Sequence, residues 1–400
     1  MNAPQGADAG GEMQWAAFVE ALAAAGSEAH RAAAAGRSAD EQTQVTQSLV
    51  WTLLGEVASL AFVDRDHPVW TPILNGTLRR YNANADATYA VAYLRGSGKY
   101  RIVGRRGTTR IVHLQTGVGT LGLGDSTRTS IVGDLNVDDC AIADDGTFEI
   151  ILSAERPEHW DGAWLRLDAA RDDSFALLRQ VAYDWSTEID AQVAIHRVDE
   201  PIAKSELSGD ELRANLVLAA RSVGEDTLAM LRVMDQQLAM APRNELAEVS
   251  ATFPGIAGQA YSHGLIEVSD DQVWLAECRI PAECTYWSVQ LMDYAYSALD
   301  ATYTQASLNG HTAATDADGV VRIVACASDP GLANWLDTGG HRRVQLRFRW
   351  YSATAPTITT TVVDRDALDT ALPHSARVTA DERQAAAVGR AVGLQWRRRW

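Results

Sequence analysis

The stretch DGTFEIILSAERP at residues 145–157 returns later in the chain as DGVVRIVACASDP at residues 318–330. In both copies an Asp-Gly pair opens an apolar run, and a proline follows the glycine after eleven residues. A Trp-Leu pair then follows each proline, at Trp164-Leu165 and at Trp335-Leu336. Asp-Gly favours a turn and proline ends a strand, so each copy is typical of a β-strand between two breaks. We therefore predict the same β-module twice.

The composition indicates a folded protein and excludes several kinds of partner. Hydrophobic residues make up 46% of the chain, enough for a sizeable core. The net charge of −17 argues against nucleic acid, because a phosphate backbone requires a basic surface. The sequence has no apolar run of about 18 residues and no basic and apolar leader. We therefore expect a cytoplasmic protein without a membrane partner.

The common cofactor and metal motifs are missing from the sequence. The four cysteines form no CxxC pair, and HxH and HExxH do not occur, so we expect no metal site. The letters GVGTLG at residues 117–122 match GxGxxG but do not open a helix, and no Walker loop occurs, so we expect no cofactor. Only two of the 35 basic residues are lysines, which leaves arginine to bind an anionic ligand.

Helical periodicity marks four segments. Residues 12–35 and 38–62 predict two amphipathic helices, and Ser38 with Glu41 forms a capping box at the start of the second. Residues 208–240 predict a third helix, which ends before a proline. Residues 381–393 predict a closing helix.

A period of two indicates strands in the remaining parts of each half. In the second half, residues 272–279 and 285–292 predict two paired strands, which we match to residues 89–94 and 100–103 of the first half. Between the strands of the first copy, residues 117–139 are longer than a usual connection and predict a functional loop or lid.

These patterns predict a mainly β protein with helical additions. We expect two related antiparallel β-sandwich or jelly-roll-like modules, which form two sandwiches or share one, with N-terminal helices and a helical insert between the modules. The expected segments are an N-terminal helical segment (1–70), a first β-module (71–200), a helical insert (201–245), a second β-module (246–370), and a C-terminal helix and tail (371–400).

Several short motifs of the second copy occur together, namely YWSVQLMD (286–293), SLNG (307–310), DG (318–319), DPG (329–331) and NWLD (334–337). With them the chain resembles a bacterial family, domain of unknown function 1214. The motif YRIVGRRG (100–107) resembles longer members, which often carry a companion, domain of unknown function 1254. The resemblance implies a jelly-roll-like β-domain and no particular activity. One departure is NANADA (82–87), where longer relatives carry an Asn-Pro-Asp-Asn-like stretch.

The densest cluster of polar and aromatic residues follows a predicted core strand. Tyrosine and histidine together can transfer protons, and aromatic walls can hold a planar substrate. The alternative is a tyrosine-rich loop packed over the end of a sandwich. The predicted catalytic residues are a base, His311 or Asp293, and an acid, Tyr294, Tyr296 or Tyr303. The predicted substrate-binding residues are Asn309, Asn334, Trp287, Trp335 and His263.

Three hypotheses of function follow from these residues. The first is a cofactor-independent lyase that acts by proton transfer on a hydroxylated aromatic or terpenoid-like small molecule. The second is a carbohydrate hydrolase, for which Asp293, Asp300 and Asp337 supply carboxylates. The third is a non-catalytic ligand-binding or assembly module, and a homo-oligomer is compatible with each. The basic aromatic tail, residues 395–400, fits a docked segment or a frayed end.

Overall fold

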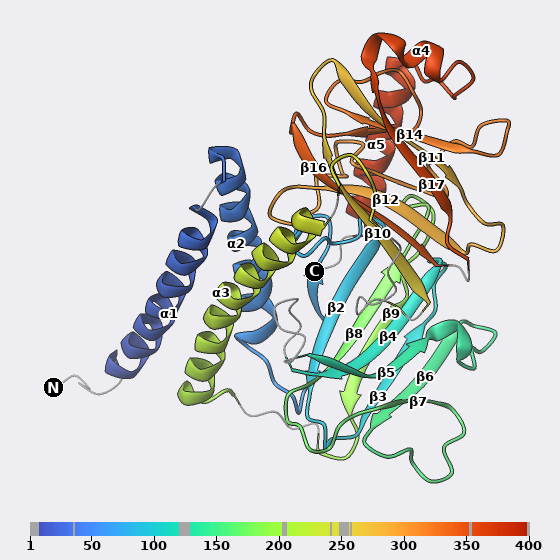
Figure 1. The fold of residues 1–400 in the computed structure, drawn as a ribbon. Coiled ribbons are helices and arrows are strands. Elements are labelled where there is room, and N and C mark those ends of the chain that lie inside the picture. The colour runs from blue at the N-terminus through green and yellow to red at the C-terminus, as the bar shows by residue number, and fades with distance from the viewer. Residues whose placement is uncertain are drawn as a thin grey trace.

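The computed structural model describes residues 8–34, 37–119, 129–201, 206–240, 242–247, 256, 258–351 and 354–397. Within these residues three long helices stand beside two β-modules, and a further helix packs behind the second module (Figure 1). The predicted class, mainly β with helices at the N-terminus and between the modules, is confirmed. None of the helices in this described part has the length and apolarity needed to cross a bilayer.

The three long helices are α1 (Asp8–Ala34), α2 (Ala39–Leu60) and α3 (Gly209–Met240), and they form one layer (Figure 1). The capping box predicted at the start of α2 is present, because the Ser38 hydroxyl accepts from the Glu41 N–H at 3.2 Å and the Glu41 carboxylate accepts from the Ser38 N–H at 2.8 Å. Leu60 of α2 and Ala219 of α3 pack in one apolar cluster with strands of the first module. The helical layer therefore covers one face of that module.

The first module is a sandwich of two sheets. One sheet has the order β1-β2-β8-β4-β5 and the other β7-β6-β3-β9. Apolar side chains of both sheets, such as Ile102, Leu114 and Ile150, share one buried core. The strands are β1 (Thr71–Leu74), β2 (Ala87–Leu94), β3 (Tyr100–Arg105), β4 (Ile111–Val118), β5 (Ser130–Asn136), β6 (Thr147–Ser153), β7 (Ala163–Arg166), β8 (Ser174–Val181) and β9 (Gln192–Arg197).

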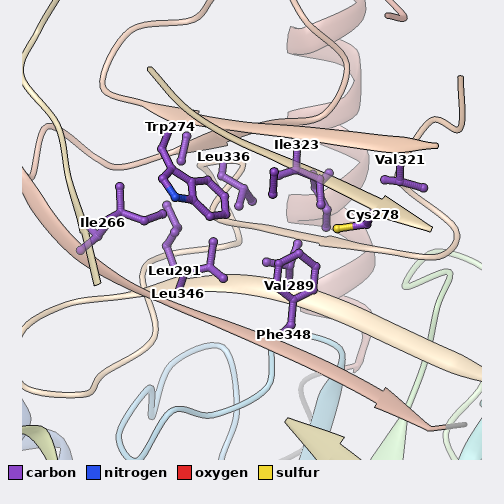
Figure 2. Close-up of a cluster of buried hydrophobic side chains, with 14 of the residues drawn as sticks. Ile266, Trp274, Cys278, Val289, Leu291, Val321, Ile323, Leu336, Leu346 and Phe348 are labelled. Atoms are coloured by element: carbon purple, nitrogen blue, oxygen red, sulfur yellow. The ribbon is translucent and has the colours of Figure 1, made fainter. Parts of the chain in front are cut away.

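The second module is a sandwich of the same kind. Its sheets have the orders β10-β16-β12-β13 and β15-β14-β11-β17. Figure 2 shows the core between them, where Trp274 and Ile323 of one sheet face Leu291 and Phe348 of the other. The strands are β10 (Gln259–Glu267), β11 (Gln272–Arg279), β12 (Tyr286–Met292), β13 (Ser307–Asn309), β14 (Val321–Cys326), β15 (Trp335–Asp337), β16 (Arg343–Tyr351) and β17 (Thr357–Asp364).

The repeat predicted from the two Asp-Gly turns is confirmed by strand order and register. Strands β10 to β17 occupy, one by one, the places that β2 to β9 occupy in the first module. The turn glycines Gly146 and Gly319 have φ values of 80° and 77°, a left-handed conformation that glycine adopts without strain. Five residues after each turn glycine the strand pairs with a tryptophan: Ile151 pairs with Trp164, and Val324 pairs with Trp335. Each Trp-Leu pair therefore forms an equivalent short edge strand.

Three details differ from the sequence-based expectations. The strand matching is wrong by one strand, because β11 corresponds to β3 and β12 to β4. This shift arose because β10 was missed, since its sequence QAYSHGLIE lacks a regular alternation of apolar and polar residues. The modules are not wholly antiparallel, since β6–β7 and β14–β15 are parallel pairs. Part of the predicted 117–139 loop is strand β5, and residues 120–128 lie outside the described residues.

The C-terminal helix joins the two modules. The remaining short helices are η1 (Val137–Asp139), η2 (Arg365–Ala367) and α4 (Leu368–Ala371), and the closing helix α5 spans Ala380–Arg397. On α5, Leu394 packs with Trp185 of the first module and Ala301 of the second. A Cβ on Gly393 would come within 2.8 Å of the Trp185 backbone, so this close approach requires glycine. The helix therefore packs against the junction between the two modules.

Candidate functional site

A pocket of about 280 Å³ lies where the first module, the second module and α5 meet. The three parts of the chain each supply one wall. The lining residues are Tyr183, Asp184, Trp185 and Ser186 from the β8–β9 connection, Gln305, Ser307, Leu308, Asn309, His311 and Thr312 from around β13, and Ala386, Gly389 and Arg390 from α5. A concave site at a domain junction is where ligands bind most often, so this is our candidate site.

His311 and Asp184 face each other across the pocket wall. The His311 Nε2 lies 3.9 Å from Asp184 Oδ2, and the imidazole is half exposed. Asp184 is fixed in place because its carboxylate accepts from the Thr187 hydroxyl at 2.6 Å and from the Ser186 N–H at 2.8 Å. These bonds, led by the one from Thr187, hold the pKa of Asp184 below its ordinary value. The pair therefore consists of an ionised carboxylate and an accessible imidazole.

Tyr183 supplies a hydroxyl group beside this pair. Its oxygen accepts a hydrogen bond of 2.7 Å from the Trp287 N–H, and among the described residues no acceptor takes its own hydrogen. Burial raises the pKa of Tyr183, which keeps the hydroxyl protonated. The fit is close, because a Cβ on Gly310 would come within 2.6 Å of the Tyr183 hydroxyl. Tyr183 is therefore a pocket-lining residue with a protonated hydroxyl group.

Asp86 lies directly behind the pocket and joins its walls. The residue ends the first module's β1–β2 connection, directly before β2, and is buried. Its Oδ1 accepts from the Trp185 Nε1–H at 2.9 Å and from the Asn309 Nδ2–H at 2.7 Å. Its Oδ2 accepts from the Tyr286 hydroxyl at 2.8 Å. Burial raises the pKa of Asp86 from 3.8 to about 6. One carboxylate thus connects both modules at the site.

Asn309 positions the loop that carries His311. Its Nδ2 donates to Asp86 and, at 3.1 Å, to the Tyr183 carbonyl. Its Oδ1 accepts from the N–H groups of His311 at 2.9 Å and Thr312 at 3.0 Å. Both ends of the amide are therefore occupied by the protein. Asn309 was predicted to orient a substrate, and its contacts make it a positioning residue for His311.

We expect the Asp86→Asn variant to lose one component of the protein's pH dependence. Because the folded-state pKa of Asp86 is raised from 3.8 to about 6, its contribution to stability is full below pH 4 and is lost as the pH rises through 6. A difference of about two pKa units corresponds to about 3 kcal/mol. Urea unfolding of both proteins between pH 4 and 8 measures this as a difference curve that favours the variant at high pH.

The same curve contains the test of this assignment. The variant keeps acceptors for Trp185 and Asn309 at Oδ1, so its fold and its stability at pH 4 should change little. A difference between the two proteins that does not vary with pH would show that Asp86 is ionised at no cost in the folded protein.

The predicted residues Asp293, Tyr294 and Tyr296 lie at a different place, in the turn after β12. The Asp293 Oδ1 accepts from the Ser297 N–H at 2.9 Å, and burial raises the Asp293 pKa to about 7. The Tyr294 hydroxyl contacts Asp235 of α3 at 3.2 Å. Tyr296 has a φ of 63° and its ring lies 5.1 Å from the Arg347 guanidinium. This cluster faces the helical layer and lines no part of the pocket.

The remaining predicted site residues have separate surroundings. Trp287 belongs to the core of the second module, and Tyr303 is 67% exposed. His263 lies on β10 opposite Arg347, and burial followed by that charge lowers its pKa to about 4. Asn334 closes a loop, with its amide bonded at 2.7 Å to both the N–H and the carbonyl of Ala314.

Trp335 is also part of the framework. Its indole N–H donates to the Cys326 carbonyl at 2.9 Å, which fixes β15 against β14. Of the ten residues predicted from sequence, the structure brings Asn309 and His311 together at the pocket and leaves the others elsewhere. The roles proposed for them from sequence stay predictions.

Sequence reasoning missed the polar residues that the first module contributes. Asn82, Asn84 and Asp86 alternate along the NANADA stretch, and all three are buried. Asn82 Oδ1 accepts from Gln290 of β12 at 2.9 Å, and Asn84 Nδ2 donates to the Tyr286 hydroxyl at 2.7 Å. The signal available in the sequence was the alternation of these polar residues with alanines directly before a strand. The NANADA stretch departs from the Asn-Pro-Asp-Asn-like stretch of longer relatives, but its side chains still connect the first module to the second.

Residues 273–355 match the sequence model of a family described as "Protein of unknown function (DUF1214)". We call this stretch the DUF1214 segment. The resemblance predicted from the motifs of the second copy is therefore confirmed over these residues. The DUF1214 segment includes Asn309 and His311, whereas Asp86, Tyr183 and Asp184 precede it.

Similarity to a solved structure extends well beyond the DUF1214 segment. An uncharacterised protein from Burkholderia cenocepacia has 27% sequence identity and a TM-score of 0.80, over 88% of this chain and 97% of that one. The VPA0106 protein from Vibrio parahaemolyticus has 12% identity and a TM-score of 0.43, over 80% of this chain and all of that one. No curated protein matches the sequence. The first similarity supports the two-module fold, and neither carries an activity.

Proposed function

We propose that the pocket between the modules is the active site of a cofactor-independent lyase, which acts by proton transfer on a small hydroxylated molecule. The observation that carries this proposal is the approach of His311 Nε2 to Asp184 Oδ2, at 3.9 Å, on the wall of a concave pocket. Acid–base catalysis requires an accessible base that a second group orients, and apo enzymes often hold such pairs at longer distances than substrate complexes do. The pair fits both conditions.

The pocket supplies both partners of an elimination. His311 takes a proton from a substrate carbon, and the electrons of that bond form a carbon–carbon double bond. The neighbouring hydroxyl group leaves with its bonding pair and takes the Tyr183 proton, so that water is released. The imidazolium returns the proton to the tyrosinate and restores both groups. Asp184 stabilises the imidazolium while it is charged, as the carboxylate of a catalytic triad does.

The size and charge of the pocket support this class of substrate. A volume of about 280 Å³ is at the lower end for ligand sites and suits a single ring better than a larger terpenoid skeleton. Tyr183 and Trp185 offer aromatic surface. Among the described lining residues Asp184 is the one carboxylate, whereas glycoside hydrolysis uses two, so the lining favours proton transfer over the hydrolase alternative.

The proposal predicts that His311→Asn lowers turnover by about 100-fold or more, as loss of a general base does. The protein is incubated in D₂O with a panel of single-ring hydroxy compounds, and NMR follows both alkene formation and the entry of deuterium at carbon. Deuterium exchange reports proton abstraction even when elimination is slow. Wild-type protein that exchanges no member of the panel, or His311→Asn protein that exchanges at the wild-type rate, overturns the assignment.

Two glycine variants separate a pocket effect from a general one. Gly389 lines the pocket, and a Cβ there meets nothing within 4 Å, so Gly389→Leu adds bulk at the pocket lining without disturbing the fold. Gly26 on α1 is equally open, so Gly26→Leu is the matched control. We expect exchange to be lost in the first variant and kept in the second, with both chains as stable as wild type or more so, since leucine favours helix over glycine.

A further inference from the structure

We infer that Arg390 anchors a carboxylate of the ligand, so that the pocket takes a hydroxylated carboxylic acid with one ring. The inference rests on the proposed function for the reaction at His311, while the anchoring itself requires only that the pocket binds a ligand. Arg390 lies on α5 and lines the same pocket as His311 and Tyr183. The anchor and the reacting groups therefore belong to one cavity.

Among the described residues, Arg390 has almost no hydrogen-bonding partner. Its Nη1 lies 3.4 Å from the Gln305 Oε1, a long contact to a neutral amide. Its Nε is buried without a hydrogen bond, and no carboxylate of the described residues pairs with it. Burial, followed by the nearby charge of Arg383, lowers the pKa of Arg390. A largely buried guanidinium without an anion costs free energy that a bound anion would recover.

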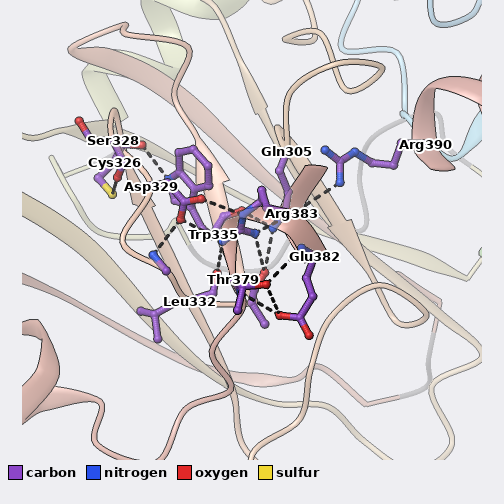
Figure 3. Close-up of polar contacts among 12 residues, drawn as sticks. Gln305, Cys326, Ser328, Asp329, Leu332, Trp335, Thr379, Glu382, Arg383 and Arg390 are labelled. Atoms are coloured by element: carbon purple, nitrogen blue, oxygen red, sulfur yellow. Dashed lines mark hydrogen bonds and ion pairs between the residues drawn. The ribbon is translucent and has the colours of Figure 1, made fainter. Parts of the chain in front are cut away.

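Arg383 on the same helix provides a comparison, because protein acceptors take its hydrogen bonds. Its guanidinium contacts both oxygens of Asp329, at 2.9 and 3.0 Å, and donates to the Leu332 carbonyl at 2.6 Å. Figure 3 shows these contacts around Arg383 and a single contact from Arg390 to Gln305. The fold neutralises one arginine and leaves the other, which faces the pocket, with open donors.

The pocket's own carboxylate is not the missing partner. Asp184 is occupied by Thr187, by Ser186 and by the approach of His311. A guanidinium holds a carboxylate through two parallel hydrogen bonds, which also fixes the orientation of a planar ligand. When Arg390 binds the carboxylate of such an acid, the ring extends along the pocket towards the other lining groups. Arg390 thus acts as a binding residue that selects acids over their neutral analogues.

The test compares 4-hydroxybenzoate with its neutral analogue 4-hydroxybenzamide, by titration calorimetry and thermal shift. We expect the acid to bind wild-type protein and the amide to bind about 10- to 100-fold more weakly, since hydrogen bonds to a charged group contribute about 1.5–3 kcal/mol. Arg390→Met should lose this preference, and Arg390→Lys should retain part of it. Arg377→Met, which removes an exposed arginine of the same region, should bind like wild type.

The outcomes distinguish this inference from the proposed function. Equal binding of acid and amide, or an unchanged preference in Arg390→Met, overturns the carboxylate anchor. A shift produced by inorganic phosphate but not by 4-hydroxybenzoate overturns it as well and assigns the site to phosphorylated ligands. If the acid binds through Arg390 and the wild-type protein exchanges no deuterium, the anchor stands and the lyase proposal fails. His311→Asn protein should still bind the acid, because His311 makes no contact with Arg390.

Discussion

Replacing Arg397 by methionine is expected to lower the free energy of unfolding by about 3–5 kcal/mol, because it leaves a buried carboxylate without its cation. The Arg397 and Asp190 side chains are 4% and 5% exposed, and the Nη2–Oδ1 distance is 2.9 Å. Arg397 also donates to the carbonyls of Asp86 at 2.8 Å and Gln180 at 3.2 Å. These contacts hold the end of α5 on the first module, so the loss should also loosen the pocket wall.

Urea unfolding of Arg397→Met and of the double variant Arg397→Met with Asp190→Asn measures this effect. The double variant removes both charges, and we expect it to be more stable than the single variant. Arg213→Met removes an arginine whose ion pair with Asp210 is largely exposed, and its midpoint should not move measurably. An Arg397→Met midpoint within error of the Arg213→Met midpoint would contradict the structural role given to this tail.

The second large effect is expected at Arg80, which joins the first module to α2. Its guanidinium lies 2.5 Å from Glu56 Oε1, and both side chains are 1% exposed. It also approaches the Tyr81 hydroxyl at 3.0 Å and packs over Gly55, where a Cβ would come within 2.5 Å of the guanidinium. Arg80→Met leaves Glu56 buried without its cation, so we again expect a loss of about 3–5 kcal/mol.

The pH dependence identifies the cause of this loss. Burial already raises the pKa of Glu56, and the charge of Arg80 acts in the opposite direction. Removing Arg80 therefore raises the Glu56 pKa further. A raised folded-state pKa contributes stability at low pH that is lost as the pH rises, so the deficit of Arg80→Met should be small at pH 4 and large at pH 8. Adding Glu56→Gln should flatten that dependence, and a deficit independent of pH would point to lost packing instead.

Much of the fold follows from local signals in the sequence. The Ser38–Glu41 capping box starts α2, and the two Asp-Gly turns start equivalent strands, because caps and turns depend on neighbouring residues. The strand matching failed at β10, where Ser262 and Gly264 interrupt the apolar alternation. In this strand the neighbours β16 and Leu246 decide the conformation, and a local pattern does not reveal them.

The candidate site followed much less from the sequence. Asp86 and Asn309 are 223 residues apart in the chain, and Asp86 and Arg397 are 311 apart, so no spacing rule links them. The aromatic cluster around Tyr294 attracted the prediction because of its composition. That cluster instead packs on the helical layer, where the Tyr294 backbone N–H also donates to the Gln44 side-chain carbonyl of α2. Which of two polar loops borders a cavity depends on how the modules dock.

The position of α5 in the chain also sets the order in which the pocket can form. Chains fold from the N-terminus during synthesis, and domains fold as units as they emerge. Both β-modules are complete before residue 380, whereas Arg390 and the Gly393 contact with Trp185 come later. Until then His311 and Asp184 border an open groove. A nascent chain therefore completes both folded modules before α5 supplies the third wall of the pocket.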